Sequence, residues 1–305
     1  MILFMHDDCA RHVTPQGHPE RVARLGAALE ALDGLDLDRR EAPLAPDADL
    51  LLCHPRSHLD ALAAAVPEEG MRALDPDTWV SPGSLDAARR GVGGACAAVD
   101  AVLGEAGRAF VLVRPPGHHA EPTRPMGFCL FSSAAIAARR AMEVHGLDRV
   151  AVLDFDVHHG NGTQACLWDE PRVRFATSQE MPLFPGTGSP EERGAHDQVR
   201  NMPLRSGAGG RDLAAVWDGA LRWLDDFEPQ LVIVSAGFDA HVDDPLATLE
   251  MREEDFAALT ARIVALAEAH AGGRVVSLLE GGYDLEALGA CTRAHVEALR
   301  DGGGT

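Results

Sequence analysis

Six apolar runs with many β-branched residues recur along the chain, and each gives way to residues typical of loops. The runs span residues 2–6, 109–117, 149–156, 172–178, 231–239 and 274–283. A strand that is covered on both faces is apolar at nearly every position, whereas a half-exposed strand alternates. The runs therefore predict the strands of a parallel sheet that is buried on both faces.

Helical periodicity occupies several of the stretches between these runs, for example residues 20–32, 84–106 and 212–227. Alternation of strands and helices is typical of an α/β fold. The Pro-, Gly- and Ser-rich segments are short, and no internal repeat or low-complexity tract precedes the final DGGGT. We therefore expect a single domain over residues 1–305, with a short disordered tail at about 301–305.

Polar side chains gather where four of the predicted strands end. They lie at residues 114–119, at residues 154–161, at Asp239 and at residues 280–283. In open α/β sheets, ligands bind outside the carboxyl ends of the strands. Four such ends that meet at one edge of the sheet predict a functional site there.

The segment VLDFDVHHG holds the first candidate metal ligands. Side chains alternate along an extended chain, so Asp154, Asp156 and His158 share one side. His159 then points away, which favours a structural role for it. An aspartate and a histidine two residues apart are a common pair on zinc. The same pair also occurs as a helix-capping carboxylate beside a structural histidine.

The segment VSAGFDAH supplies a candidate third ligand. Asp239 ends a buried strand, where an unpaired carboxylate would be costly and a metal would relieve that cost. His241 is a competing ligand, which we rank lower because it lies further into the loop. Two carboxylates and one imidazole make a formally neutral zinc site with an open position, as in catalytic zinc sites.

The segment RPPGHHAEP presents two adjacent histidines on a turn that its prolines and glycine make rigid. His118 and His119 could both bind metal, or they could form a structural pair. A metal-bound water that attacks an acyl carbon needs a general base, and histidine is the usual one because its pKa lies near neutrality. The segment therefore predicts a proton-handling histidine.

Tyr283 is the only tyrosine of the chain and follows two glycines at the end of a buried strand. A phenol can stabilise an oxyanion, and glycines let the backbone approach a substrate closely. Chance could also leave one tyrosine at this position. The location favours a hydroxyl placed for catalysis.

Charge and cysteine content restrict the class of protein. The formal charge is −20 and the chain has no lysine, which disfavours binding to nucleic acid or anionic membranes and would attract a cationic substrate. The six cysteines form no CxxC motif. The start MILFMHDD does not resemble a signal peptide, and ARIVALAEAHA is too short to span a bilayer. We expect a soluble, cytoplasmic protein.

Taken together, these segments resemble the signature blocks of the zinc-dependent histone deacetylase family. The matching blocks, in the family's order, are RPPGHHA, GFC, DFDVHHGNGT, FPGTG, SAGFDAHVDDPL and LEGGY, with GHPERVARL before them. The resemblance runs from about residue 6 to about residue 297. Asn161 in HHGNGTQ is similar to the class II branch and its bacterial relatives. The resemblance implies the arginase/deacetylase fold, a single α/β domain around an eight-stranded parallel sheet.

The resemblance also implies a role for each matching residue. It makes Asp156, His158 and Asp239 ligands of Zn²⁺, with Fe²⁺ as an alternative in the cell. His119 handles the proton of the attacking water, with His118 as its partner, and Tyr283 polarises the carbonyl. Asp154 pairs with His118, and Asn161 is the neutral partner of His119. The implied substrate channel is lined by Gly127, Phe128, Phe184, Leu246 and Gly282, with Arg21 deeper behind the metal. A structural K⁺ site is implied at Asp154, Asp156, His158, Thr177 and Ser178.

The implied activity is zinc-dependent removal of acetyl or other acyl groups from acyl-lysine or similar amides. Many relatives have a histidine near Gln179 or Glu180. Its absence here puts interactions at the rim of the channel in doubt, but not the chemistry. Leu246 stands where relatives that act on acetylpolyamines can place a glutamate, so it favours acyl-lysine. An acetylpolyamine deacetylase remains the alternative, followed by a non-hydrolytic acyl-lysine binder. A binuclear ureohydrolase would need more clustered ligands. The chain could also form a homo-oligomer.

Overall fold

The computed structural model describes residues 1–105 and 107–302 and contains an eight-stranded sheet in which every pair of neighbours is parallel. Its strand order is β2-β1-β5-β10-β9-β6-β7-β8. The strands are β1 (Ile2–Met5), β2 (Asp38–Glu41), β5 (Arg108–Val111), β6 (Val150–Asp154), β7 (Val173–Glu180), β8 (Val199–Leu204), β9 (Leu231–Ala236) and β10 (Val275–Leu279). The predicted α/β fold around an eight-stranded parallel sheet is confirmed.

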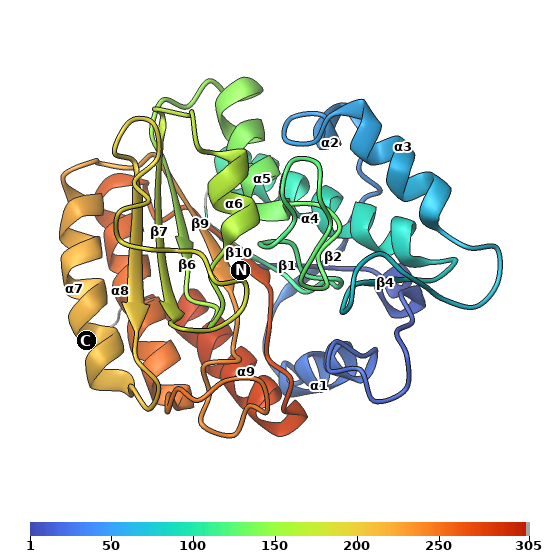
Figure 1. Cartoon of the computed structure of the whole chain (residues 1–305). Helices are drawn as coiled ribbons and strands as arrows, with labels where there is room; N and C mark the ends of the chain where they lie inside the picture. The colour runs from blue at the N-terminus through green and yellow to red at the C-terminus, as the bar shows by residue number, and fades with distance from the viewer. Residues whose placement is uncertain (106, 303–305) are drawn as a thin grey trace.

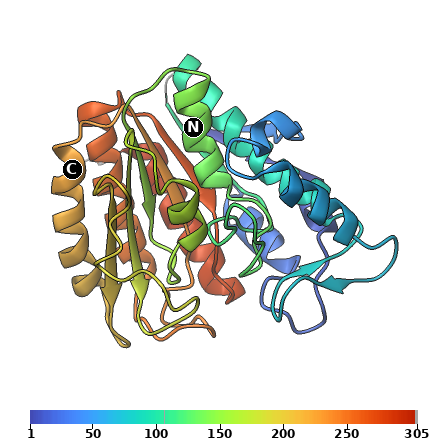
Figure 2. The same cartoon turned by 45° about the horizontal axis from the view of Figure 1, so that its top comes forward.

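Helices cover both faces of this sheet (Figures 1 and 2). One face carries α1 (Ala23–Ala31), α7 (Gly210–Asp225), α8 (Glu253–His270) and α9 (Leu285–Asp301), and the other carries α4 (Ser84–Glu105) and α5 (Ser133–Glu143). Further elements are η1 (Asp7–Arg11), α2 (Asp47–Leu50), α3 (Arg56–Ala65), α6 (Asn161–Cys166) and a hairpin of β3 (Arg72–Ala73) and β4 (Trp79–Val80).

Alternation along the buried strands divides the core into two layers. In β9, Leu231 and Ile233 pack with the helices α4 and α5, whereas Val232 and Val234 pack with α7 and α8. Each of these side chains is fully buried. A third cluster, which includes Leu50 of α2, joins α2 and α3 to the outer side of α4 and α5. Burial on both faces explains why the strands are apolar without alternation.

All six predicted strands exist, but most end earlier than their apolar runs. The run at 109–117 is a strand only to Val111, and the remainder continues as a loop. The sequence reasoning missed β2 and β8, which lie at the two edges of the sheet. β2 has the sequence DRRE and is largely exposed, so no apolar run marks it.

The C-terminal boundary also differs from the prediction. Asp301, expected in a disordered tail, is the last residue of α9, and Gly302 follows it in a left-handed conformation. Residues 303–305 of the predicted tail lie outside the described residues. No helix among the described residues is both long and apolar enough to cross a membrane.

Candidate active site

The carboxyl ends of β6, β9 and β10 stay side by side beyond the last ladder residues. The backbone amide of Phe155 donates to the carbonyl of Ser235, and that of Phe238 donates to the carbonyl of Gly281. The central parallel strands therefore deliver their loops to one place. This is the edge at which the sequence predicts a site.

Asp156, His158 and Asp239 form a buried cluster with ligand atoms within 4.8 Å of one another. His158 Nδ1 lies 3.1 Å from Asp156 Oδ1 and 3.1 Å from Asp239 Oδ2. Backbone amides hold the carboxylates in place: Gly281 N–H donates to Asp156, and Val157 N–H donates to Asp239. The three predicted ligands are therefore brought together from the segments that follow two separate strands, β6 and β9.

Two glycines allow the carboxylates to converge. A Cβ atom at Gly281 would lie 2.1 Å from Asp239 Oδ2, and one at Gly237 would lie 2.0 Å from Asp156 Oδ2. Both distances are far inside van der Waals contact. Any larger residue at either glycine would therefore displace a ligand oxygen.

The electrostatics of the cluster fit a divalent cation. Asp156 and Asp239 are completely buried, and no arginine forms an ion pair with either of them in the part of the chain that the structure describes. Burial opposes protonation of His158, but the two carboxylates outweigh it and raise the pKa of this histidine to about 10. The site thus stabilises positive charge, and its O₂N donor set is one that zinc accepts.

His118 and His119 pack against each other, with ring centroids 4.0 Å apart, but they have different partners. His118 Nδ1 lies 3.0 Å from Asp154 Oδ2. Burial opposes a charge on His118, yet Asp156 and Asp154 raise its pKa well above the ordinary value. Burial raises the pKa of Asp154 to about 7, against the opposing effect of His118.

His119 has the opposite electrostatic character. Its Nδ1 lies 2.8 Å from Asn161 Oδ1, so it contacts an amide instead of a carboxylate. Burial and the neighbouring charge of His118 lower the pKa of His119 well below the ordinary value. A neutral imidazole beside a cationic one is an arrangement in which His119 can accept a proton.

Tyr283 lies in the segment that follows β10. Its backbone amide donates to Asp244 Oδ2 at 2.7 Å, and the guanidinium carbon of Arg24 is 5.0 Å from the ring centroid. Burial and the charge of Asp239 raise the pKa of Tyr283 well above its usual value. The phenol therefore stays protonated and can donate a hydrogen bond.

A cavity of about 360 Å³ leads from the surface to these groups. His119, His158, Tyr283, Gly127, Phe128, Phe184 and Leu246 line it, together with His18, Pro19, Pro76, Asp77 and Leu183. The ring of Phe184 meets His119 edge-on at 5.1 Å between centroids, and the ring of Phe128 meets Tyr283 at 5.8 Å. Two aromatic rings thus lie next to the reactive groups.

Phe128 adopts a left-handed backbone conformation, with φ 68°, which is unfavourable for a bulky residue. The backbone amide of Phe128 donates to the Thr78 hydroxyl, and His18 packs edge-on against the Phe128 ring, with 4.8 Å between the ring centroids. The preceding Gly127 also has positive φ, and a Cβ there would lie 2.4 Å from the His119 ring. These contacts hold the aromatic wall of the cavity in place.

The prediction for Arg21 is wrong, since its side chain is exposed in the turn before α1. Arg24, within the first turn of α1, is the buried arginine instead. It donates to the carbonyls of Gly282 and Glu280 and to Glu20 Oε1. Gly282, with φ 115°, is not part of the cavity lining; it lies behind Tyr283 as an acceptor for Arg24.

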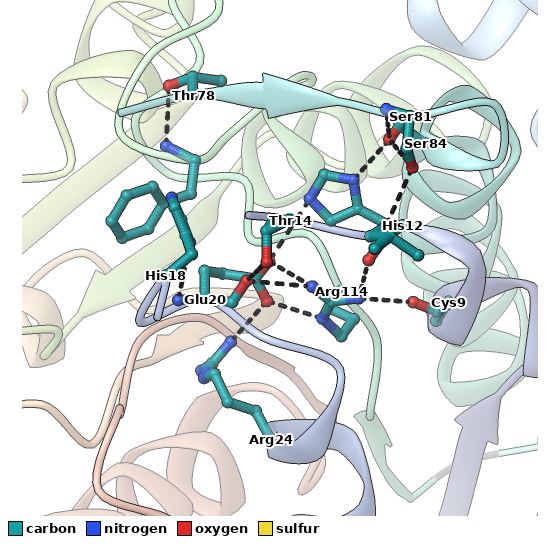
Figure 3. A network of polar contacts seen from close by, with 12 residues as sticks. Cys9, His12, Thr14, His18, Glu20, Arg24, Thr78, Ser81, Ser84 and Arg114 are labelled. Carbon is teal, nitrogen blue, oxygen red and sulfur yellow. Dashed lines mark hydrogen bonds and ion pairs between the residues drawn. The ribbon is translucent and has the colours of Figure 1, made fainter. Parts of the chain in front are cut away.

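Arg114 and Arg24 meet at the fully buried carboxylate of Glu20 (Figure 3). Arg114 donates to both carboxylate oxygens and to the carbonyls of Cys9 and His12. Arg114 begins the loop that carries the two histidines, and Arg24 holds the loop of Tyr283. The segment before α1 therefore connects both loops, a connection that sequence reasoning missed.

Glu280 is a second missed residue. Its completely buried side chain accepts hydrogen bonds from the amides of Gly117 and His118 and from the hydroxyl of Ser235. It thereby joins the end of β10 to the histidine loop. The LEGGY segment contained this glutamate, but only the three-dimensional arrangement identifies its partners.

The remaining candidates are two histidines outside the ligand cluster and the residues of the predicted K⁺ site. His159 contacts Thr187 and Gln164 and not the carboxylate cluster, which agrees with a structural role. His241 lies near Asp243 and Glu253 and is not part of the cluster. Thr177 pairs with Asp154 in the sheet, and the Ser178 hydroxyl accepts from Trp217. The K⁺ site at these residues stays a prediction.

Comparisons with known proteins agree with this geometry. Residues 18–299 match the model of the histone deacetylase domain. The chain is 43% identical to a histone deacetylase-like amidohydrolase of Pseudomonas aeruginosa, over 92% of this chain and 76% of that protein. It is 36% identical to a probable deacetylase of Archaeoglobus fulgidus, covering 93% and 81% of the two chains. The crystal structure of the HDA15 HD domain superposes with a TM-score of 0.91 at 30% identity, covering 98% of this chain and 90% of that one.

Proposed function

Because the chain belongs to the histone deacetylase family and is an amidohydrolase of the deacetylase type, we propose that it uses Zn²⁺ to remove acyl groups from acyl-lysine side chains. The observation that carries the proposal is the cavity. An aromatic-walled passage ends at a neutral histidine, a protonated phenol and a carboxylate–imidazole cluster.

The shape and polarity of the passage favour an aliphatic stem that ends in an amide. Phe128 and Phe184 present apolar ring faces and edges, which suit the methylene groups of a lysine side chain. Leu246 at the cavity wall is apolar and offers no partner for a free ammonium group. Asp77 is the carboxylate of the lining, and its pKa is raised by burial and by Asp75.

The reactive groups support hydrolysis by an activated water. Asp156, His158 and Asp239 would hold the ion, whose Lewis acidity polarises an amide carbonyl and lowers the pKa of water. His119 accepts the proton of the attacking water at Nε2, because Asn161 occupies its Nδ1. Tyr283 donates its hydroxyl hydrogen to the developing oxyanion. His119 then returns the proton to the departing amine.

His118 supports this sequence without touching the cavity. Against the opposing effect of burial, Asp156 and Asp154 raise the pKa of His118 well above its ordinary value, which favours its cationic form, and its ring lies beside His119. Its positive charge disfavours a second charge nearby and keeps His119 neutral before reaction. The structural K⁺ that we expect at Asp154, Thr177 and Ser178 would add to the positive charge behind this pair.

A panel of substrates tests the proposal. Zinc-loaded protein is assayed on acetyl-lysine peptides, longer acyl-lysine peptides and acetylated polyamines, with iron-loaded and metal-free protein in parallel. We expect the highest kcat/KM on an acyl-lysine peptide and no turnover without metal. Higher kcat/KM on acetylpolyamines would favour the alternative function, and activity on no amide would exclude both.

A further inference from the structure

The side-chain amide of Asn161 links the base His119 to a carboxylate outside the cavity. Asn161 Oδ1 lies 2.8 Å from His119 Nδ1, and its Nδ2 donates to Glu121 Oε1 at 2.9 Å. Weaker contacts of Nδ2 reach the His119 carbonyl and the Met126 sulfur, both at 3.4 Å. His119, Asn161 and Glu121 thus form a continuous chain of hydrogen bonds.

This arrangement determines the orientation of the amide. The three groups around Nδ2 are a carboxylate, a carbonyl and a thioether, which are all acceptors. A flipped amide would direct its oxygen at these acceptors and its NH₂ at His119. The observed orientation requires hydrogen on His119 Nδ1, so Nε2 carries the lone pair that faces the substrate.

Glu121 is the strongest of the three acceptors, because it is charged and its distance to Nδ2 is the shortest. Its backbone is fixed by a tight turn, in which Glu121 and Arg124 exchange both amide-to-carbonyl hydrogen bonds. Glu121 forms no ion pair with an arginine or histidine within the described ranges 1–105 and 107–302. The half-buried Glu121 carboxylate therefore has no cationic partner there, and it accepts from the Asn161 amide.

The neighbouring histidine offers a comparison. His118 contacts the Asp154 carboxylate directly, whereas His119 is separated from the carboxylate of Glu121 by one amide. We propose that Glu121 is a positioning residue that acts through Asn161 to hold His119 in the tautomer with a free Nε2. The inference rests on the proposed hydrolysis, in which His119 is the base.

The first test removes the acceptor. Glu121→Ala leaves Asn161 Nδ2 with only its two weaker acceptors. The flipped amide should then become populated, so kcat should fall about tenfold or more while KM changes little. Glu121→Gln keeps an acceptor oxygen and should recover part of the lost kcat. Arg124→Gln is the matched control, since it changes an exposed side chain on the same turn. An unchanged kcat in Glu121→Ala would overturn the proposal.

A second test uses the charge of residue 161. In an Asn161→Asp background, Glu121 faces another carboxylate, so Glu121→Gln should raise kcat there, although it lowers kcat in the wild type. A purely structural glutamate would give the same loss in both backgrounds. Equal losses would therefore refute the relay.

A third readout is independent of turnover. The ¹⁵N shifts of His119, assigned by comparison with His119→Gln, report which ring nitrogen carries hydrogen. We expect the Nδ1–H form in the wild type and a mixture of tautomers in Glu121→Ala. An unaltered tautomer in Glu121→Ala would contradict the inference. If the wild type hydrolyses no amide, the proposed function fails, and this measurement still decides the role of Glu121.

Discussion

At the scale of single residues, the site separates groups of the same type by their contacts. Asp154 and Asp156 lie two residues apart, yet one pairs with His118 and the other joins the ligand cluster. His118 and His119 are adjacent, but the pKa of the first is raised and that of the second is lowered. Environment, more than residue type, therefore assigns the chemical roles.

Replacing Tyr283 with Phe removes only the hydroxyl. We expect kcat to fall about 10²–10³-fold, because one oxyanion donor is lost, with metal content and thermal stability close to wild type. Activity assays measure kcat, metal analysis measures the zinc content, and calorimetry measures the thermal stability. Wild-type turnover in Tyr283→Phe would show that the phenol is not part of the reaction.

Asp239→Ala should abolish stoichiometric metal binding. The variant leaves Asp156 and His158 as two ligands, and zinc in protein sites takes three or four. Metal content after dialysis against defined zinc measures the effect, and Asp243→Ala is a control on an exposed carboxylate of the same loop. Equal zinc content in Asp239→Ala and the wild type would disprove its ligand role.

At the scale of elements, two histidines connect the outer helical layer to the wall of the cavity. His54, between α2 and α3, accepts from the amide of Ser132, and its Nδ1 lies 3.2 Å from the Pro122 carbonyl. His58 of α3 contacts the Leu130 carbonyl at 2.9 Å. The two rings stack at 4.6 Å. They therefore hold both ends of the loop that contains Phe128.

These contacts predict a dependence of stability on pH. Burial and the proximity of His58 lower the pKa of His54 to about 4. In the unfolded chain His54 takes up a proton near pH 6.5, whereas in the folded protein it does so only near pH 4. The neutral His54 therefore contributes fully to the free energy of unfolding above pH 6.5, and this contribution is lost as the pH falls from 6.5 to 4. Between pH 7 and pH 5, the free energy of unfolding of His54→Gln should therefore decrease by about 2 kcal/mol less than that of the wild type.

Denaturant unfolding at several pH values measures this difference. The exposed His196 supplies the control, since His196→Gln also removes one histidine but contacts neither helix nor loop of this layer. Parallel stability curves for His54→Gln and the wild type would contradict the prediction.

At the scale of the whole molecule, the formal net charge is −20, and the cavity of about 360 Å³ opens on this acidic protein. Such a field attracts cationic substrates, and added salt screens it over about 10 Å at 0.1 M. The field acts on encounter with the substrate, whereas the buried site determines the chemistry.

The rate for charged substrates should therefore depend on salt. We expect kcat/KM for an acyl-lysine peptide flanked by arginines to fall about threefold or more as NaCl rises from about 0.05 to 0.5 M. A peptide flanked by neutral residues should change little. Potassium is kept constant, so that the expected K⁺ site is not affected. The same salt dependence for both peptides would exclude electrostatic attraction.

The sequence by itself determined the features that depend on local pattern. Continuous apolar runs identified the central strands, and period-two alternation separated Asp156 and His158 from His159. Buried strands and extended chains impose these patterns on neighbouring residues, so they can be recognised without coordinates. The ends of two further apolar runs likewise made Asp239 and Tyr283 candidates for a ligand and a catalytic hydroxyl. The resemblance to the family's blocks added the aromatic residues Phe128 and Phe184.

Only the tertiary structure decided the features that depend on contacts between distant segments. The structure shows that Arg24, and not Arg21, is the buried arginine near the site. The orientation of α1 relative to the end of β10 determines which of the two is buried. The structure also revealed Glu280 and Glu121, whose partners lie 163 and 40 residues away along the chain. A carboxylate has the same local signature whether it is solvated or bonded to a distant amide, so its role is decided when the segments meet.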